Sequence, residues 1–280
     1  MCILFIAYRV FSNSPLLILD NRDENLSRPT DPLHDWGNGI VGGKDQLKSG
    51  TWMAVNKNTG RFAVLTNRRR PFQRKKKQET DKPKQEKLSR GEIVLNILNS
   101  ESPLEQCLSE FNFCKKQYGG FNIVTGDLNG WENNQEKLYY FNNYQEPFII
   151  KLNPFNVYGL SNTFLHSTWP KVKLGVSLLQ NMKDTDVENF ENLFKLMTNN
   201  YKVPDDQLID TGLKNKETES CLSSIFVDFH QENYGTRTTS ILQLFANNPS
   251  YLFFSERTYP SPESTNIYSD VTIEIPINSK

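Results

Sequence analysis

The sequence predicts an α+β fold in which two antiparallel sheets stack between layers of helices, a four-layer αββα sandwich. Two observations predict it. Strand-like runs come as hairpins, and helical patterns fall into two groups, which is the order of an α+β fold and not the alternation of a parallel α/β sheet. Several strand-like runs are also apolar at consecutive positions, as expected where both faces of a strand are covered.

The N-terminal region predicts a β-hairpin. Apolar runs occupy residues 2–8 and 16–19, and Ser12-Asn13-Ser14-Pro15 between them favours a turn. No basic residue precedes the first run and Arg9 interrupts it, so it does not resemble a secretory signal. No later stretch reaches the roughly 18 apolar residues that a membrane span needs. We therefore expect a soluble, cytoplasmic protein that is not secreted.

The later strands show the same signals. A second hairpin spans residues 52–56 and 61–66 around the turn Lys57-Asn58-Thr59-Gly60. Gly42-Gly43 lacks the strand-to-helix context of a phosphate loop, so a tight turn is expected there. Further strands are predicted at residues 121–125, 137–141, 147–151, 157–160, 224–229, 236–245 and 251–255.

Two pairs of helices are predicted between the strands. Ser89 followed by Glu92 has the spacing of a capping box, and Ser102-Pro103 repeats a helix-start signal. The first of these helices has one apolar face, made of Ile93, Val94, Ile97 and Leu98. The second pair is predicted at residues 170–182 and 186–198.

Composition favours a single domain over residues 1–280. The 280 residues are 37% hydrophobic and 12% aromatic, which is sufficient for one sizeable core. No internal repeat and no Pro/Gly/Ser-rich linker divides the chain. Because 32 basic residues balance 32 acidic ones, no chain-wide attraction to nucleic acid or to an anionic membrane is expected.

One segment departs from this balance. Residues 68–87 contain ten basic and three acidic residues and show no periodicity, so a mobile loop is predicted at about 70–87. The segment is either a solvated insertion or a basic surface that makes peripheral contact with anionic lipid headgroups.

Cysteine and histidine usage gives no sign of a metal centre. The four cysteines, at positions 2, 107, 114 and 221, form no CxxC pair, which argues against a disulfide framework and a zinc site. His34, His166 and His230 are isolated in the sequence and are interpreted as surface or hydrogen-bonded residues. No metal site is predicted.

Cys2 is the first candidate for chemistry. Removal of the initiator Met would leave a free α-amine and a free thiol on one residue, so that the amine takes the thiol proton and the thiolate attacks a carbonyl. The alternative is that Cys2 is a small apolar residue at the start of a core strand.

A polar quartet, Asn21-Arg22-Asp23-Glu24, follows the second apolar run. A hairpin would place it beside the first strand and close to Cys2. A neighbouring Arg lowers the pKa of a thiol, and a carboxylate can orient an ammonium or the Arg. The alternative is a strand that ends in solvent, with Arg22 and Asp23 as a surface pair that contributes little.

The quartet and a series of ordered motifs resemble the NRDE-domain family from residue 1 to about 245. These motifs are Met1-Cys2-Ile3-Leu4, Arg28-Pro29, Gly42-Gly43-Lys44-Asp45, Gly50-Thr51-Trp52, Thr66-Asn67, Ser89-Arg90-Gly91, Gly159-Leu160-Ser161-Asn162, Trp169-Pro170-Lys171 and Tyr234-Gly235-Thr236-Arg237. The resemblance implies roles in haem trafficking, acyl-lipid homeostasis and Golgi or secretory organisation. It also implies a cytoplasmic protein associated with the Golgi or with mitochondria.

That family in turn resembles the cysteine N-terminal-nucleophile hydrolases. This more distant resemblance implies the αββα sandwich and a set of candidate catalytic residues: Cys2, Arg22, Asp23, Asn67, Asn162 and Arg237. The candidate ligand-binding residues are Asn21, Arg22, Glu24, Trp52 and Arg237. The local order Asn-Arg-Asp differs from the Arg-Asn-x-Asp of the hydrolases, so the roles of the Arg and the Asp could be shifted.

Three functions remain open at this point. The first is a carrier that needs no cofactor and binds a bulky apolar ligand such as haem or an acyl lipid. Trp36, Trp52 and Trp169 are expected to lie partly in the core, and the alternative is a mouth lined by these aromatic rings, which would suit such a ligand. The second is an amidohydrolase that cleaves a carbon–nitrogen bond through Cys2. The third is a membrane-peripheral scaffold.

Overall fold

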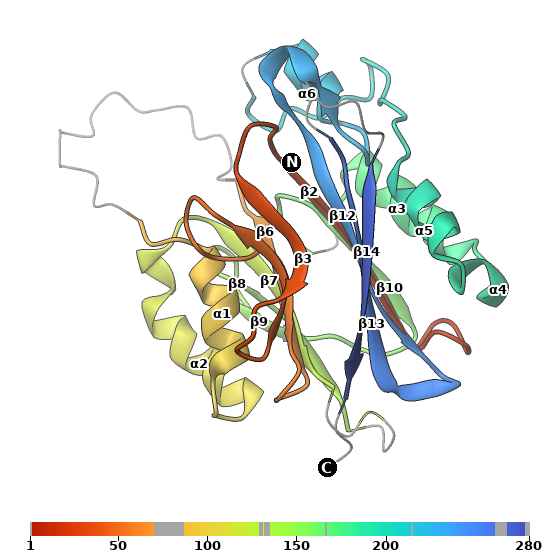
Figure 1. Ribbon diagram of the computed structural model, residues 1–280. Helices are drawn as coiled ribbons and strands as arrows, with labels where there is room; N and C mark the ends of the chain where they lie inside the picture. Colours follow the sequence, from red (N-terminus) through yellow and green to blue (C-terminus); the bar gives the residue numbers. More distant parts are fainter. Residues whose placement is uncertain are drawn as a thin grey trace.

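The computed structural model describes residues 2–69, 87–128, 131, 135–165, 167–213, 215–260 and 268–277, and these form two seven-stranded antiparallel sheets with helices on their outer faces (Figure 1). The predicted α+β class with antiparallel sheets is confirmed.

The first sheet contains both ends of the described chain. Its strand order is β10-β1-β2-β12-β13-β14, and β11 pairs with β12. The predicted N-terminal hairpin is confirmed, because β1 pairs with β2 in antiparallel register. The strands are β1 (Ile3–Tyr8), β2 (Leu16–Asn25), β10 (Asn156–Leu160), β11 (Asp228–Phe229), β12 (Tyr234–Phe245), β13 (Asn248–Thr258) and β14 (Ser269–Pro276).

The second sheet is a meander in which each strand pairs with the next along the chain. The predicted hairpin of β5 and β6 is confirmed within this sheet. The strands are β3 (Thr30–Asp35), β4 (Ile40–Asp45), β5 (Met53–Asn56), β6 (Arg61–Asn67), β7 (Phe121–Asp127), β8 (Lys137–Asn142) and β9 (Ile149–Lys151).

Helices cover the outer face of each sheet (Figure 1). The helices α1 (Gly91–Asn99) and α2 (Leu104–Cys114) pack on the second sheet. On the first sheet lie α3 (Pro170–Gln180), α4 (Asp184–Val187) and α5 (Phe190–Met197). The short helix α6 (Lys216–Cys221) lies beyond the upper ends of β2 and β12 in this view.

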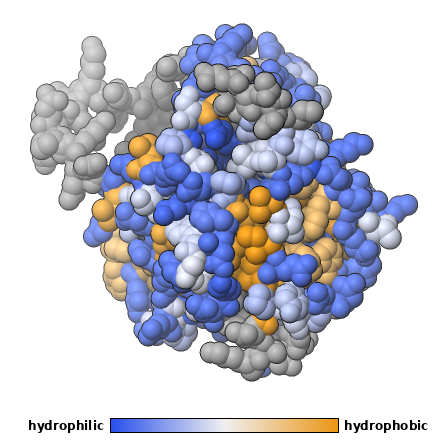
Figure 2. All heavy atoms as spheres, viewed as in Figure 1, coloured by the Kyte–Doolittle hydropathy of each residue, from blue (hydrophilic) through white to orange (hydrophobic). Residues whose placement is uncertain are grey.

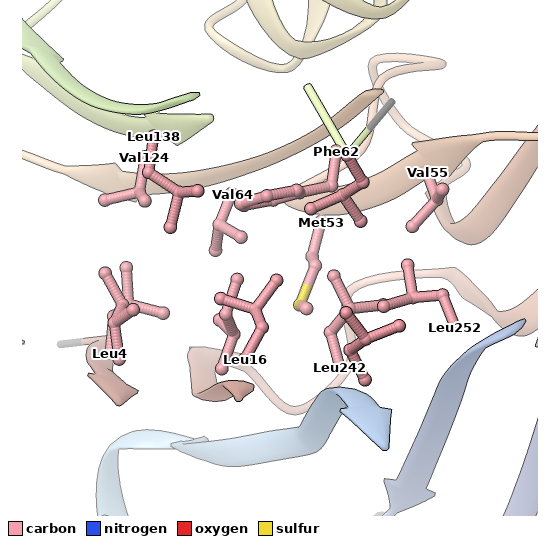
Figure 3. Close-up of a cluster of buried hydrophobic side chains, with 14 of the residues drawn as sticks. Leu4, Leu16, Met53, Val55, Phe62, Val64, Val124, Leu138, Leu242 and Leu252 are labelled. Atoms are coloured by element: carbon pink, nitrogen blue, oxygen red, sulfur yellow. The ribbon is translucent and has the colours of Figure 1, made fainter. Parts of the chain in front are cut away.

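The largest hydrophobic cluster lies between the two sheets. Leu4, Leu16 and Leu242 from the first sheet face Met53 and Val64 from the second (Figure 3). On the face seen in Figure 2, a hydrophobic stripe runs between the edge strands β3 and β14 through a mostly hydrophilic surface. Among the described residues, no helix is long and apolar enough to cross a membrane.

The polar quartet lies inside a strand and not after one. β2 runs to Asn25, because residues 21–25 pair with β12 and Asn21 also pairs with Ile3. The expectation that the strand ends after residue 19 is therefore wrong. Pairing with β1 and β12 extends the strand through the quartet. The polar residues gave no sign of this pairing in the sequence.

Several local predictions also need correction. The N-cap of α1 is Arg90 with no side-chain cap hydrogen bond, so the capping box from Ser89 is absent. Gly42-Gly43 lies within β4, where a Cβ at Gly42 would meet Met53 O at 2.6 Å and one at Gly43 would overlap the Trp52 ring. The glycines therefore permit close strand packing and not a tight turn. The mobile loop predicted at about 70–87 lies, except for Lys87, outside the described residues.

Candidate functional site

Adjacent residues of the quartet project to opposite faces of the first sheet. Leu16 and Ile18 of β2 belong to the cluster between the sheets, whereas Leu17 and Leu19 face the helices. Side chains alternate along a strand, so Arg22 faces the second sheet while its neighbours in the quartet face the helical layer. Asn21 lies on the helical side, where its Nδ2 donates to Met197 O at 2.9 Å and to Ile225 O at 3.0 Å.

Arg22 is buried between the two sheets. Its Nη2 donates to Asp45 Oδ2 at 3.1 Å, and its guanidinium lies 4.5 Å from the centre of the Trp52 ring. Asp45 is on β4, so this ion pair joins the two sheets. Arg28 contacts the same carboxylate from a more exposed position.

Arg22 and Asp23 do not form the expected pair. Within the described part of the chain, the ion-pair partner of Arg22 is Asp45. Asp23 lies on the other face of the sheet, where its Oδ1 accepts a 2.6 Å hydrogen bond from Thr236 Oγ1. Neighbours in a strand cannot share one face, which is why the predicted pairing is wrong.

A row of acidic and hydroxyl side chains lies beside Arg22. Asp20, Ser240 and Glu256 are opposite one another on β2, β12 and β13. Glu256 accepts hydrogen bonds from Ser240 Oγ at 2.9 Å and from Leu33 N at 2.8 Å. Burial raises the pKa of Glu256 to about 7 and raises the pKa of Asp20 well above its ordinary value, the charge of Asp23 adding to the shift of Asp20.

Around Arg22, several buried polar atoms have no hydrogen-bond partner among the described residues. They come from one patch, because Thr238 is directly opposite Arg22 on β12 and Trp52 is stacked against it. Buried donors and acceptors without partners are rare in proteins and commonly bind water or a ligand. The atoms are Asp20 Oδ1, Arg22 Nη1, Trp52 Nε1, Thr238 Oγ1 and Arg237 Nε.

Cys2 is buried immediately before β1, beside a hydrogen bond that joins the two sheets. Ser161 Oγ donates to Cys2 O at 2.8 Å, and next to it Asn162 Nδ2 donates to Asn67 O at 2.5 Å. Cys2 Sγ lies 3.8 Å from Asp23 O. Burial is the main reason that the pKa of the thiol is raised to about 11, which keeps the sulfur protonated near neutral pH.

Two further residues lie near Cys2, and the sequence did not predict either of them as a site residue. Tyr234 OH donates to Asp23 O at 3.0 Å. Lys171 Nζ donates to Leu222 O at 3.0 Å, and burial lowers the pKa of this amine to about 8 although the charges of Asp23 and Cys2 oppose the shift. Both residues belong to motifs that resemble the NRDE-domain family. These motifs are the signal by which the sequence could have indicated them as site residues.

Cationic side chains surround this end of the first sheet. Arg69, Arg90 and Arg237 are partly buried, and the pKa of each guanidinium is lowered, mainly by burial. None of the three forms an ion pair within the described part of the chain. Arg237 occupies a bulge of β12 between two residues that pair with β2, and the charge of Arg22 also lowers its pKa. This grouping favours an anionic ligand.

The structure therefore brings the six candidate catalytic residues to one end of the first sheet and the adjoining end of β6. It divides them between two faces, however, with Arg22 between the sheets and the side chain of Asp23 on the helical side. Glu24 is partly exposed, and its Oε1 accepts from Asn25 N at 2.8 Å. Among the described residues, no group of three His, Cys, Asp or Glu could hold a metal ion.

The three tryptophans do not share a mouth. Trp52 packs between the sheets, Trp36 packs under α1 and α2, and Trp169 packs with the helices of the first sheet. The expectation that these tryptophans lie partly in the core is confirmed, and the alternative of a shared aromatic mouth is wrong because each ring contributes to a different core. A small apolar pocket of about 30 Å³ does lie beside Trp169 and Lys171, lined also by Val203, Leu208, Ile209 and Leu222.

Comparison with known proteins gives consistent matches along almost the whole chain. Residues 1–261 match the family model described as Transport and Golgi organisation 2. The Transport and Golgi organization 2 homolog of Mus musculus is 30% identical over 279 residues, covering 92% of this chain and 93% of the mouse protein. The homologs of Homo sapiens and Bos taurus are 30% and 26% identical, and they cover 92% and 95% of this chain and 93% and 95% of their own.

Proposed function

This chain belongs to the Transport and Golgi organisation 2 family, and from that premise we propose that it is a carrier of a bulky apolar molecule with an acidic group. Its relatives are named for transport and Golgi organisation, which supports a role in the secretory pathway. We assign it to haem trafficking and acyl-lipid homeostasis, with haem or a fatty acyl compound as the ligand and with a cytoplasmic location beside the Golgi or mitochondria.

The observation that carries this proposal is the group of buried donors without partners around Arg22. Arg22 Nη1, Trp52 Nε1 and Thr238 Oγ1 are hydrogen-bond donors in a water-poor environment. A carboxylate supplies acceptors for several donors at once, and its charge would balance a guanidinium. Arg237, which lies next to Thr238 and is partly exposed, is the cation that an entering ligand would meet.

An apolar body needs a surface near these cations. The apolar pocket beside Trp169 adjoins Lys171, which is close enough to Cys2 and Asp23 for their charges to act on its amine. A ligand whose body occupies this pocket would have its acidic group near Lys171 and Cys2. It would have to extend past this end of the first sheet to reach the donors around Arg22, which lie on the other face. The pocket volume of about 30 Å³ means that the segment around Leu208 must move when such a ligand enters.

Replacement of Arg237 tests the proposal. Titration of haem and of a fatty acyl-CoA into Arg237→Gln should give dissociation constants roughly tenfold or more higher than in the wild type, because a charge-assisted contact is lost. Arg9→Gln is the matched control, since Arg9 is a partly buried arginine paired with Glu136 at the far end of β1. Equal affinities in the wild type and both variants would contradict the proposal.

The alternative function is that of an N-terminal cysteine amidohydrolase, for which the hydrogen bonds from Ser161 to Cys2 and from Asn162 to Asn67 are the specific observation. In this reaction the Cys2 sulfur attacks an amide carbonyl and forms a thioester, the carbon–nitrogen bond breaks, the amine leaves with a proton, and water hydrolyses the thioester. The raised pKa of the Cys2 thiol opposes it. We also propose, on the same resemblance, that the layered fold is the αββα sandwich of these hydrolases.

The scaffold alternative depends on the basic segment at 70–87, which lies almost entirely outside the described residues. Sedimentation with vesicles that contain anionic lipid, at low and at high salt, would test it. Binding at low salt that is lost when the segment is deleted would favour a membrane-peripheral role.

A further inference from the structure

A second hollow in the molecule is separate from the Arg22 cluster. It has a volume of about 640 Å³ and lies between α6 and the segment that contains β11. Small-molecule sites commonly have volumes of roughly 300 to 1,000 Å³, so the volume is sufficient for a compound of that kind. Most of the lining side chains are exposed, so the hollow is an open depression of the surface and not an enclosed cavity. Its lining residues are Lys202, Asp205, Lys216, Glu217, Ser220, Cys221, Asp228, Phe229, His230 and Gln231.

A cysteine with an ammonium beside it lies in this hollow. Cys221 is the last residue of α6, is partly exposed, and has Lys202 Nζ 3.9 Å from its Sγ. The ammonium donates toward the sulfur, so a charged group lies directly beside the thiol. Cys2 and Cys107, in contrast, are buried.

The other lining charges have both signs. Lys202 and Lys216 can bind carboxylates, while Asp205, Glu217 and Asp228 can bind an ammonium group. His230 Nε2 lies 3.2 Å from Asp228 Oδ1, and both residues line the hollow. A site with this pattern fits a small zwitterion that has more than one carboxylate and an amine.

We propose that Cys221 is a modification site that forms a mixed disulfide with a small zwitterionic peptide thiol. The Cys221 thiolate attacks one sulfur of the disulfide form of that peptide, a new sulfur–sulfur bond forms, and the original one breaks. The second peptide leaves as a thiolate and takes a proton from water. The protein thiol is thereby oxidised to a disulfide, and one half of the reagent is reduced to a thiol.

The test uses oxidised glutathione as the probe on the full chain. Intact-mass measurement over time should show one glutathionyl group, and peptide mapping should place it on Cys221. Cys221→Ser should prevent this adduct. Cys114→Ser should not, and Cys114 is the matched control because it is also partly exposed and its Sγ contacts Phe111 O at 3.5 Å. Adduct formation on Cys114 at an equal or greater rate would overturn the proposal.

A second comparison separates recognition of the peptide from simple exposure of the thiol. Oxidised glutathione should react with the wild type faster than an uncharged hydroxyethyl disulfide, and Lys202→Gln should slow the glutathione reaction roughly tenfold while changing the hydroxyethyl reaction less. Lys116→Gln is the control for a remote exposed lysine. Equal rates for the two reagents, or a Lys202→Gln variant as fast as the wild type, would show that the hollow does not select its reagent.

Discussion

At the scale of single residues, Arg22 determines the electrostatics between the sheets. It pairs with Asp45 at 3.1 Å and lies in the same buried layer as Asp20 and Glu256. Charged groups removed from water need a partner, and loss of that partner leaves an uncompensated buried charge. The stability of this layer therefore depends on the Arg22 guanidinium, and so does the anion binding that we propose.

Arg22→Ala should lower the free energy of unfolding by about 3 kcal/mol, because Asp45 loses the more buried of its two arginine partners and a cavity opens beside Trp52. Arg28→Ala is the control: it shares Asp45, but its side chain is 24% exposed against 6% for Arg22. It should cost about 1 kcal/mol or less. Urea denaturation measures both values, and an Arg22→Ala midpoint equal to that of the wild type would refute the importance of the pair.

Glu256 gives a prediction for the pH dependence of stability. Its folded-state pKa of about 7 lies above its ordinary value of 4.5, so the folded protein binds the proton more tightly than the unfolded chain. Stability from this group is therefore present at low pH and is lost as the pH rises from about 4.5 to about 7. At pH 8, Glu256→Gln should be more stable than the wild type by up to about 3 kcal/mol.

The Gln side chain can retain the local hydrogen bonds. Its oxygen can accept from Leu33 N, and its amide can donate to the Ser240 hydroxyl, which can rotate. Unfolding curves between pH 4.5 and pH 8 should show a shallower decline in the variant, with a residual slope from Asp20, whose pKa is shifted in the same direction. Equal declines of stability with pH in the two proteins would contradict the raised pKa of Glu256.

At the scale of elements, a glycine in α3 permits this helix to pack closely on the first sheet. A Cβ built at Gly175 would overlap the buried ring of Phe5 on β1. Close approach at this point brings the N-terminal part of the helix, with Lys171, near Cys2. The packing of an element thus positions a site residue that lies 169 positions from Cys2 in the sequence.

Gly175→Ala should reduce the free energy of unfolding by about 1 to 3 kcal/mol, although Ala favours a helix more than Gly does, because the ring of Phe5 cannot move within a filled core. Gly119→Ala is the control, since its nearest neighbour would be Arg90 Cδ at 3.9 Å. Thermal unfolding should show a lower midpoint for the Gly175 variant alone. A midpoint for the Gly175 variant equal to or above that of the wild type would mean that α3 can shift away from Phe5 at no cost.

Sequence patterns predicted the elements that carry strong apolar signals and missed those that do not. The β1–β2 and β5–β6 hairpins and the apolar face of α1 were evident from spacing. Strand β3 reads Thr-Asp-Pro-Leu-His-Asp, and only Leu33 in it is buried. Its sequence therefore has no alternation of apolar and polar residues that would predict a strand. The edge strand β14 is mostly exposed, and β13 holds it in place.

At the scale of the whole molecule, the fold assembles the candidate site from both sheets and from a helix. The sequence indicated Cys2, the quartet and Arg237 through a family resemblance, and the structure places them together. Glu256, Asp45 and the thiol's burial could not be predicted, because they depend on which strands become neighbours. The roles of these residues in catalysis or ligand binding stay predictions.

The most direct test of the carrier account is an equilibrium titration of haem and of a fatty acyl-CoA into the wild type and into Cys2→Ala. If the acidic group of the ligand binds the arginines and the thiol stays protonated, both proteins should bind the same ligand with dissociation constants within about threefold of each other. Failure of the wild type to bind either ligand, or loss of binding in Cys2→Ala, would contradict the account.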